Sequence, residues 1–358
     1  MRLERLRIQG LRCLADAELQ LGDGLHMLAG ANGAGKTSVL EAAFLLSHGR
    51  SFRSGARDAL LQRGAVTLSV FGEWRRADDR LLRLGLGRNG NRWEARIDGE
   101  GANLGELVQA CAVVCFEPGS HALIAGSAEE RRRFLDWGVF HVEHAFLPVW
   151  RRYQRALKQR NSLLRSSDPG DDALFAPWEA ELVQCARQID GWRSAYLQAL
   201  SPHLQRQATR LLPELGPLEC RYRRGWADDR DLGEVLASQR GRDVGRGHTG
   251  QGAHRADWAI VFEQAPMREH LSRGQEKLTA MACLLAQAAL FAERNGEWPL
   301  VCLDDLASEL DEPHQHAVLD LLQSSGAQVL VTGTDVPAPM RGLPVRVFHV
   351  EHGQILPA

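Results

Sequence analysis

A glycine-rich segment near the start of the chain carries residues suited to phosphate chemistry. Residues 30–37 read GANGAGKT and match GxxxxGK[ST] at all four fixed positions. Glycines let backbone N–H groups wrap phosphates, the lysine adds a compact charge, and the threonine hydroxyl suits Mg²⁺. A glycine-rich turn before a helix is the alternative interpretation. The expected nucleotide contacts are Gly30, Ala31, Asn32, Gly33, Ala34, Gly35, Lys36, Thr37 and Ser38, with Thr37 as a metal ligand.

Two aspartates follow a short apolar run near the other end of the chain. Residues 301–303, VCL, predict a buried strand, and ligands bind at the carboxyl ends of such strands in open α/β sheets. We expect Asp304 to hold Mg²⁺ through water and Asp305 to orient or activate the attacking water. Lys36, which reaches the outer phosphates as a point charge, is the other catalytic candidate. A helix N-cap followed by its first turn is the alternative. Because Asp304 lies 268 positions after Lys36, the site requires both ends of the chain.

A serine-containing motif precedes the last long helical pattern. In residues 271–278, LSRGQEKL, Ser272 and Gln275 have the spacing of a capping box, which is one interpretation. The segment is also similar to the signature of ABC-type ATPases, which presents its serine to the γ-phosphate held by a partner subunit. Residues 304–311, DDLASELD, continue as the D-loop of that class does. These likenesses imply that Ser272, Gly274, Gln275 and Asp311 contact nucleotide across an ATP-dependent homodimer.

Hydrophobic periodicity predicts the elements that must position these residues. Asn89-Gly90 between apolar runs predicts a β-hairpin. Helices are expected over 37–47, 275–294 and 314–323, and strands over 25–29, 66–74, 81–86, 300–303, 329–331 and 345–350. The predicted fold class is α/β: an ABC-type P-loop ATPase head, with a mixed sheet, helices and an antiparallel β subdomain, that carries an inserted helical arm.

The middle of the chain changes to long helical periods. Apolar residues recur at helical spacing from Phe146 to Leu164, and from Trp178 to Ala199 in the alternating steps of a coiled-coil seam. Residues 166–172, SSDPGDD, separate them and favour an antiparallel helical hairpin over two ordinary amphipathic helices. Residues 221–255, rich in Arg, Gly and Asp, predict a mobile loop. The expected domains are a head of residues 1–115 and 256–358 and a helical arm or lid of residues 116–255.

Composition excludes several classes of protein. No apolar run reaches the roughly 18–20 residues of a membrane span, and the start lacks a signal-peptide core. Seven scattered cysteines without CxxC indicate neither a disulfide framework nor a zinc site. We therefore expect a cytoplasmic protein without a membrane partner. Its net charge of −2 does not exclude a local basic patch. Forty of the 43 basic residues are arginine, and the lysines are Lys36, Lys158 and Lys277.

Seven motifs together resemble the RecF family almost from end to end. They are GANGAGKTSVLEA at 30–42, GRSFR at 49–53, RRRFLDWGVFH at 131–141, LKQRNSLLR at 157–165, HRAD at 254–257, LSRGQEKL at 271–278 and LDDLASELD at 303–311. The resemblance implies an SMC/Rad50-like ABC ATPase head with ATP and Mg²⁺ as cofactors, and an ATP-dependent dimer that binds single- and double-stranded DNA. It also implies a role in DNA replication, repair, recombination and the SOS response, by helping RecA loading at single-strand gaps with RecO and RecR.

Three positions depart from the wider ABC pattern. Asp305 is one methylene shorter than the usual glutamate, which predicts slow hydrolysis suited to a switch. Together with the DNA binding that the resemblance implies, this gives the expectation of a weak, DNA-dependent ATPase. A Q-loop glutamine is not evident near residues 114–118. Thr332-Gly333-Thr334 replaces the switch histidine, and a threonine hydroxyl could reach the γ-phosphate through water.

Arginines are the expected DNA contacts, through phosphates and without base readout. Residues 131–165 hold nine basic residues and two acids. The candidates are Arg131, Arg132, Arg151, Arg152 and Arg155, each of which could instead lie on a solvated helix face. Two alternative functions remain: an ATP-gated DNA clamp or scaffold without significant turnover, and an ABC transporter ATPase subunit.

Overall fold

The computed structural model describes residues 1–53, 57–90, 92–166 and 172–357. The chain divides into two compact units: unit 1 is Met1–His121, Arg210–Leu212 and Arg273–Ala358, and unit 2 is Ala122–Thr209 and Pro213–Ser272. Both boundaries differ from the expected ones: the first falls at 121/122 and not at 115/116, and the second at 272/273 and not at 255/256. The second differs because β10 (Asp257–Phe262) pairs with β9 (Leu218–Arg223) inside unit 2. No helix in the described part of the chain combines the length and apolar character that a membrane crossing needs.

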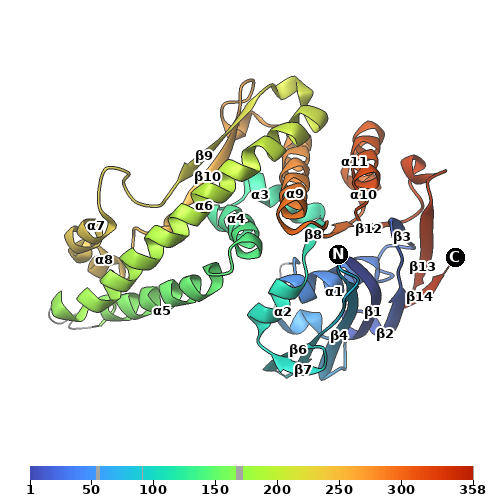
Figure 1. The fold of residues 1–358 in the computed structure, drawn as a ribbon, viewed down its shortest axis with the longest axis horizontal. Coiled ribbons are helices and arrows are strands. Elements are labelled where there is room, and N and C mark those ends of the chain that lie inside the picture. The colour runs from blue at the N-terminus through green and yellow to red at the C-terminus, as the bar shows by residue number, and fades with distance from the viewer. Residues whose placement is uncertain (54–56, 91, 167–171, 358) are drawn as a thin grey trace. The chain divides into compact units, whose positions relative to one another are not determined.

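A six-stranded mixed sheet forms the centre of unit 1 (Figure 1). Its order is β14 (Gln354–Pro357), β13 (Val345–Glu351), β3 (Leu25–Ala29), β12 (Val329–Gly333), β11 (Leu300–Leu303) and β8 (Val113–Phe116). The strands from β13 to β8 run parallel to one another, and β14 is antiparallel to β13. The carboxyl ends of the parallel strands therefore meet at one edge of the sheet. The glycine-rich loop after β3 and the two aspartates after β11 therefore emerge together, on either side of the end of β12.

A second, antiparallel sheet packs with the first around one buried helix. Its order is β2 (Leu14–Gln20), β1 (Arg2–Leu11), β4 (Thr67–Arg75), β5 (Leu81–Asn89), β6 (Arg92–Ile97) and β7 (Glu100–Ala102). The predicted hairpin is confirmed, with Asn89 opposite Arg92. Helix α1 (Lys36–His48) is buried along most of its length and contributes to the same hydrophobic core as both sheets. This burial fixes the direction in which the glycine-rich loop enters the helix.

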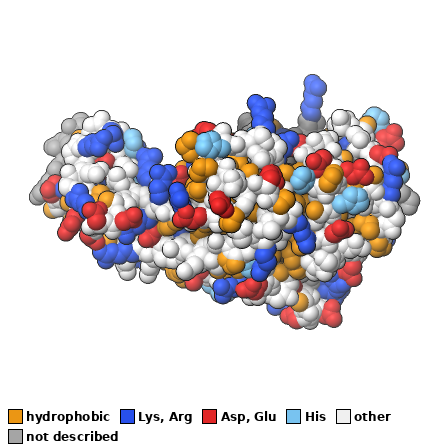
Figure 2. All heavy atoms as spheres, turned by 90° about the horizontal axis from the view of Figure 1, so that it is seen from above, with side chains coloured by type: hydrophobic (Ala, Val, Ile, Leu, Met, Phe, Trp, Pro, Cys, Tyr) orange, Lys and Arg blue, Asp and Glu red, His pale blue; other side chains and the backbone are white. Residues whose placement is uncertain are grey.

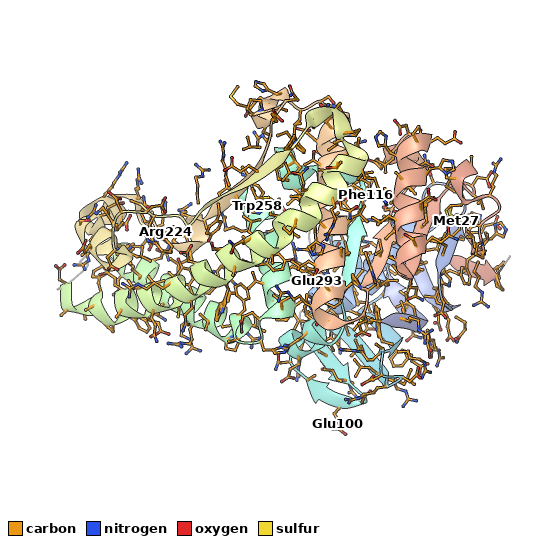
Figure 3. All side chains as sticks on the ribbon, turned by 45° about the horizontal axis from the view of Figure 1, so that its top comes forward. Met27, Glu100, Phe116, Arg224, Trp258 and Glu293 are labelled. Atoms are coloured by element: carbon orange, nitrogen blue, oxygen red, sulfur yellow. The ribbon has the colours of Figure 1, made fainter. Side chains whose placement is uncertain are left out.

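Further helices complete unit 1. They are α2 (Leu104–Ala110), α9 (Arg273–Asn295), α10 (Leu306–Glu309) and α11 (Glu312–Ser325). Figure 1 shows α9 and α11 on the side of the mixed sheet away from α1. In Figure 3, the label Phe116 identifies the edge strand β8 of that sheet, and the label Met27 identifies the inner strand β3. The predicted mixed sheet, helices and antiparallel subdomain are thereby confirmed.

Unit 2 is built around a helical hairpin. Its helices are α3 (Ala122–Ala125), α4 (Ala128–Val142), α5 (Phe146–Leu164), α6 (Ala176–Leu211, whose last two residues count in unit 1), α7 (Leu232–Ser238) and α8 (Arg240–Arg246). Arg152 on α5 bonds Glu181 on α6, whereas Arg160, farther along α5, bonds the earlier Glu179. This reversed order confirms the antiparallel hairpin. Residues 167–171 of the predicted break between its helices lie outside the described residues.

The predicted mobile loop over 221–255 is wrong, because part of it forms α7 and α8. Buried apolar side chains of α7 and a buried charge cluster hold them. The Arg160 guanidinium donates to Glu179 at 3.0 Å, to Asp243 at 2.8 Å and to the Thr249 hydroxyl at 2.9 Å. Buried charges require such partners, since an unpaired one costs several kcal/mol. The partner of Asp243 lies 83 positions away, so local periodicity could not indicate this contact.

Two histidines of unit 2, the buried His141 and the half-buried His254, predict acid sensitivity. Burial lowers the pKa of His141 to about 3 and that of His254 to about 4. In the unfolded chain both histidines titrate near 6.5, so below that pH the unfolded state binds more protons than the folded state. Between pH 6.5 and 5 we expect the free energy of unfolding to fall by up to about 1.4 kcal/mol per pH unit for each histidine.

Urea unfolding followed at several pH values between 6.5 and 5 measures this slope. His349→Gln, the same replacement at an exposed position in unit 1, is the matched control. His254→Gln should flatten it by about one proton. A wild-type stability that is constant over this range contradicts the assignment of both histidines as neutral.

Candidate nucleotide-binding site

The glycine-rich loop has a backbone that its glycines make possible. Gly30 follows β3 and donates its N–H to the carbonyl of Gly333 at 3.2 Å, and a Cβ added at Gly30 would lie 2.1 Å from the Val350 carbonyl oxygen. Gly33 and Gly35 have φ values of 81° and 121°, which L-residues with side chains rarely adopt. The loop therefore turns sharply into α1, whose N-terminal N–H groups face the space above it.

The Lys36 side chain folds back onto the start of the loop. Its ammonium donates to the carbonyls of Gly30 at 2.8 Å and Ala31 at 2.9 Å, and the side chain is largely buried. A compact charge with rotatable N–H groups can shift from these carbonyls to phosphate oxygens, whereas a planar guanidinium is larger and differently shaped. The retention of lysine in this arginine-rich chain has a structural reason here.

Asp304 joins the two ends of the chain at this site. Its Oδ1 accepts hydrogen bonds from the hydroxyls of Thr37 at 2.8 Å and Thr332 at 2.7 Å. Burial raises the pKa of Asp304, while the two hydroxyl donors oppose that rise by stabilising the charged carboxylate. The expectation that distant segments would meet is confirmed, because Thr37 and Asp304 are 267 positions apart.

Asp305 lies in the left-handed region, with φ 53° and ψ 44°. Aspartate tolerates this region better than most residues. Its N–H donates to the Thr332 hydroxyl at 2.9 Å, and its carbonyl accepts from the amides of Ser308 and Glu309 at 2.9 and 3.2 Å. The residue thus starts α10 from a rigid turn directly after β11.

The donor set at this edge fits Mg²⁺ held together with phosphates. The Thr37 hydroxyl donates a hydrogen bond to Asp304, so the lone pairs of the Thr37 oxygen stay available for a hard cation. Among the described residues no group of three His, Cys, Asp or Glu side chains is arranged to hold a metal by itself. An ion bound through one hydroxyl and one carboxylate would need phosphate oxygens or waters, which is how Mg²⁺ usually binds.

The signature and D-loop residues lie at the starts of two helices. Ser272 directly precedes α9, and Gly274 and Gln275 stand in its first turn; Ser272 and Gly274 are exposed. Asp311 caps α11 by accepting the N–H of His314 at 3.1 Å. Their predicted contacts with nucleotide involve a second subunit, so they stay predictions.

Sequence reasoning missed one buried group beside the loop. Glu41 on α1 is fully buried and accepts two hydrogen bonds from Arg12, at 3.0 and 2.7 Å, and one from Ser51. Arg53 lies 3.8 Å from the same carboxylate and acts electrostatically on Asp304. The signal was an acid inside the apolar helical run VLEAAFLL. Glu41 thus connects the motif GRSFR to the helix that begins with Lys36.

The candidate DNA-binding arginines divide into engaged and exposed residues. Arg131 forms a bidentate ion pair with Asp257 at 2.7 and 3.0 Å, and its side chain is only 14% exposed. Arg132 donates to the carbonyl of Ala256 at 2.7 Å, and burial lowers its pKa. Trp258 on β10, visible in Figure 3, donates to the carbonyl of Arg131. Arg131 and Arg132 are therefore committed to holding α4 against the segment around HRAD.

Arg152 is exposed but bonded to Glu181 at 2.6 and 3.0 Å. Arg151 and Arg155 are exposed on α5. The five residues chosen from one basic segment therefore do not form one surface.

The mixed sheet, phosphate loop and paired acids define an SMC-type ATPase head. Residues 2–353 match the family model described as "RecF/RecN/SMC N terminal domain". Within that class the chain belongs to the RecF family. It is 49% identical, over 99% of its length and 98% of the relative's, to "DNA replication and repair protein RecF" of Xanthomonas euvesicatoria pv. vesicatoria (strain 85-10).

Two solved structures have the same fold over nearly the whole chain. One, titled "Structure of the recombination mediator protein RecF-ATP in RecFOR pathway", has a TM-score of 0.91 at 24% identity and covers 99% of this chain and 97% of its own. The other, of "RecF-ATPrS" in the same pathway, has a TM-score of 0.88 at 25% identity and covers 99% and 98%.

Proposed function

We propose that this chain is an ATP-dependent DNA-binding protein of DNA replication, repair and recombination, acting as RecF does. In this proposal two copies close around ATP·Mg²⁺, bind single- or double-stranded DNA, and help load RecA at single-strand gaps with RecO and RecR, which supports the SOS response. The family carries the biological part. The observation that carries the biochemical part is the contact of Thr37 with Asp304, which assembles a phosphate loop and a metal-holding acid from both ends of the chain.

The residues of the site divide the work. The loop of Gly30–Ser38 binds and orients the phosphates through its N–H groups, and Lys36 neutralises the outer ones. Thr37 and Asp304 would hold Mg²⁺, which when bound neutralises charge that develops on the phosphates. Asp305 stands next to Asp304 and would orient the attacking water. Ser272, Gly274, Gln275 and Asp311 of one copy would complete the site of the other.

Slow hydrolysis follows from the shortness of the catalytic acid. Asp305 replaces a longer glutamate and is held in a rigid turn, so a water must come closer to the backbone to reach its carboxylate. Single-turnover hydrolysis with and without DNA separates a weak ATPase from a clamp without significant turnover. We set aside a transporter ATPase subunit, because the relatives aligned over 99% of this chain are named RecF.

Dimerisation and DNA retention, measured together, test the proposal. Light scattering should give twice the monomer mass with ATP and Mg²⁺, and the monomer mass when EDTA removes the metal. DNA should be retained more strongly in the first condition. A chain that stays monomeric with ATP and Mg²⁺, or that retains DNA equally in both conditions, contradicts an ATP-gated DNA-binding dimer.

A basic stripe on α5 is the DNA-contacting surface that we favour. Arg151, Arg155, Lys158 and Arg165 are exposed and recur at four-, three- and seven-residue intervals, which places them on one side of the helix and its end. They span about 21 Å at about 1.5 Å per residue. On the face that Figure 2 shows, basic and acidic side chains are interspersed. The stripe replaces Arg131, Arg132 and Arg152, which are engaged within unit 2.

Neutralising the stripe should weaken DNA binding and its salt dependence. For the triple variant Arg151→Gln, Arg155→Gln and Lys158→Gln we expect the slope of log K against log salt to fall by about 0.9 for each phosphate of duplex DNA that the protein no longer neutralises. Fluorescence anisotropy over a salt series measures the slope.

A second triple variant controls for total charge. Arg133, Arg152 and Arg187 are exposed but paired with Glu129, Glu181 and Asp231, so Gln at these positions removes the same total charge from arginines that acids already engage. Equal slopes for the two triple variants contradict the stripe.

A further inference from the structure

Thr332 occupies the centre of the catalytic edge. It lies near the carboxyl end of β12, between β3, which leads into the phosphate loop, and β11, which leads into the paired aspartates. In the parallel register Val331 is opposite Leu303, so Thr332 comes level with Asp304. The side chain is buried, with 1% of the residue exposed. Its place is thus set by the sheet itself and not by a loop.

One hydroxyl serves both acids. The Thr332 hydroxyl donates to Asp304 Oδ1 at 2.7 Å and accepts the backbone N–H of Asp305 at 2.9 Å. The directions follow from chemistry, since an amide N–H can only donate and an ionised carboxylate can only accept. Each partner therefore favours the orientation of the hydroxyl that the other needs. A β-branched side chain with a restricted χ1 holds that arrangement at low entropic cost.

The two bonds act on different parts of the acids. The first orients the Asp304 side chain together with Thr37, which donates to the same oxygen. The second fixes the peptide plane between Asp304 and Asp305, where the chain adopts the left-handed conformation that starts α10. Backbone in this region requires support from its surroundings. Without the hydroxyl, the Asp305 backbone and the Asp304 carboxylate would each lose a hydrogen bond that fixes their orientation.

This geometry distinguishes Thr332 from a residue that contacts the nucleotide. Its hydroxyl is buried, donates a hydrogen bond to the Asp304 carboxylate and accepts one from the Asp305 N–H. Thr334, two residues later, is exposed, so its hydroxyl is the accessible one of the two.

We propose that Thr332 is a positioning residue for ATP hydrolysis, which couples the metal-holding Asp304 to the water-orienting Asp305 through one shared hydroxyl. The proposal rests on the proposed ATPase function. It assigns to Thr332 a role in the catalytic step and in Mg²⁺ use, and no role in holding the nucleotide.

Three variants of the full chain separate these roles. Thr332→Val keeps the shape and removes the hydroxyl, Thr332→Ser keeps the hydroxyl, and Thr334→Val removes the exposed hydroxyl nearby. For Thr332→Val we expect single-turnover hydrolysis to slow about 10- to 100-fold, as for the loss of hydrogen bonds to a charged group, with ATP affinity within about threefold of wild type. The Mg²⁺ concentration for half-maximal ATP-driven dimerisation should rise. Thr332→Ser should restore both quantities to near wild type.

Each other outcome overturns the proposal. Wild-type hydrolysis by Thr332→Val excludes a positioning role, and an equal defect in Thr332→Ser assigns the effect to packing of the methyl group. A matching loss of ATP affinity makes Thr332 a nucleotide contact. If Thr332→Val does not fold, the comparison of Thr332→Ala with Thr332→Ser decides by the same criteria. Failure of the wild-type chain to bind ATP or dimerise would instead refute the proposed function, independently of Thr332.

Discussion

Replacing Lys36 with methionine is expected to weaken ATP binding at least about 100-fold. Methionine keeps most of the length and apolar stem of lysine, so its packing under the loop changes little. The ammonium, which now bonds the carbonyls of Gly30 and Ala31, is lost. Charge-assisted hydrogen bonds contribute about 1.5–3 kcal/mol each, and tenfold in affinity corresponds to about 1.4 kcal/mol. Two such bonds to phosphate oxygens account for the expected loss.

The other lysines provide a matched control. Lys158→Met makes the same change on the exposed side of α5, outside the phosphate loop, and should leave the ATP dissociation constant unchanged. Isothermal titration calorimetry with ATP and Mg²⁺ compares the three proteins, and a thermal melt without nucleotide confirms that Lys36→Met is folded. Normal ATP binding by a folded Lys36→Met protein would refute the assignment of residues 30–38 as the nucleotide site.

Replacing Ser272 with arginine is expected to abolish ATP-driven dimerisation and to spare ATP binding. Ser272 is exposed directly before α9, a 23-residue helix, and has no expected contact with the nucleotide of its own subunit. In the closed dimer a small hydroxyl and a helix N-terminus would meet the γ-phosphate of the other subunit. An arginine there fills the space that the partner needs. ATP affinity of the monomer should stay within about threefold, because distant sites behave independently.

Light scattering with ATP and Mg²⁺ gives the dimer fraction, and calorimetry gives the affinity. Ser324→Arg, at an exposed serine near the end of α11, is the control for adding a bulky charge. It should dimerise as the wild type does. If Ser272→Arg also dimerises normally, the site is not shared between subunits. If it loses ATP binding, Ser272 belongs to the nucleotide site of its own subunit.

Local pattern was sufficient for most of the head. Apolar runs predicted β3 and β11 with the bounds that the structure has, because these central strands are buried on both faces and carry few polar residues. Helices α1, α9 and α11 were predicted to within two residues at each end, since glycine, serine and aspartate precede their starts. The phosphate loop and the acids after β11 were recognised because each is contiguous in sequence.

The relations between distant segments were less accessible. Thr332 was noticed only as a replacement for a histidine, and its shared hydrogen bonds to Asp304 and Asp305 depend on strand register. Glu41 stands out in the sequence as an acid inside an apolar helical run, but nothing there identifies Arg12, 29 positions earlier, as its partner. Residues 221–255 lacked a sustained period because α7 buries an apolar face only one turn long, and α8 is held by the buried ion pair of Asp243 with Arg160.

The basic segment 131–165 shows most clearly what the sequence determines and what the tertiary structure determines. The sequence by itself determined its composition, nine basic residues against two acids, and thereby suggested a surface for DNA. The tertiary structure decided which charges are available. Acids from outside the segment pair with Arg131, Arg133, Arg152 and Arg160: Asp257, Glu129, Glu130, Glu181, Glu179 and Asp243. Charge counts along a chain cannot include these partners, because electrostatic attraction depends on distance in space.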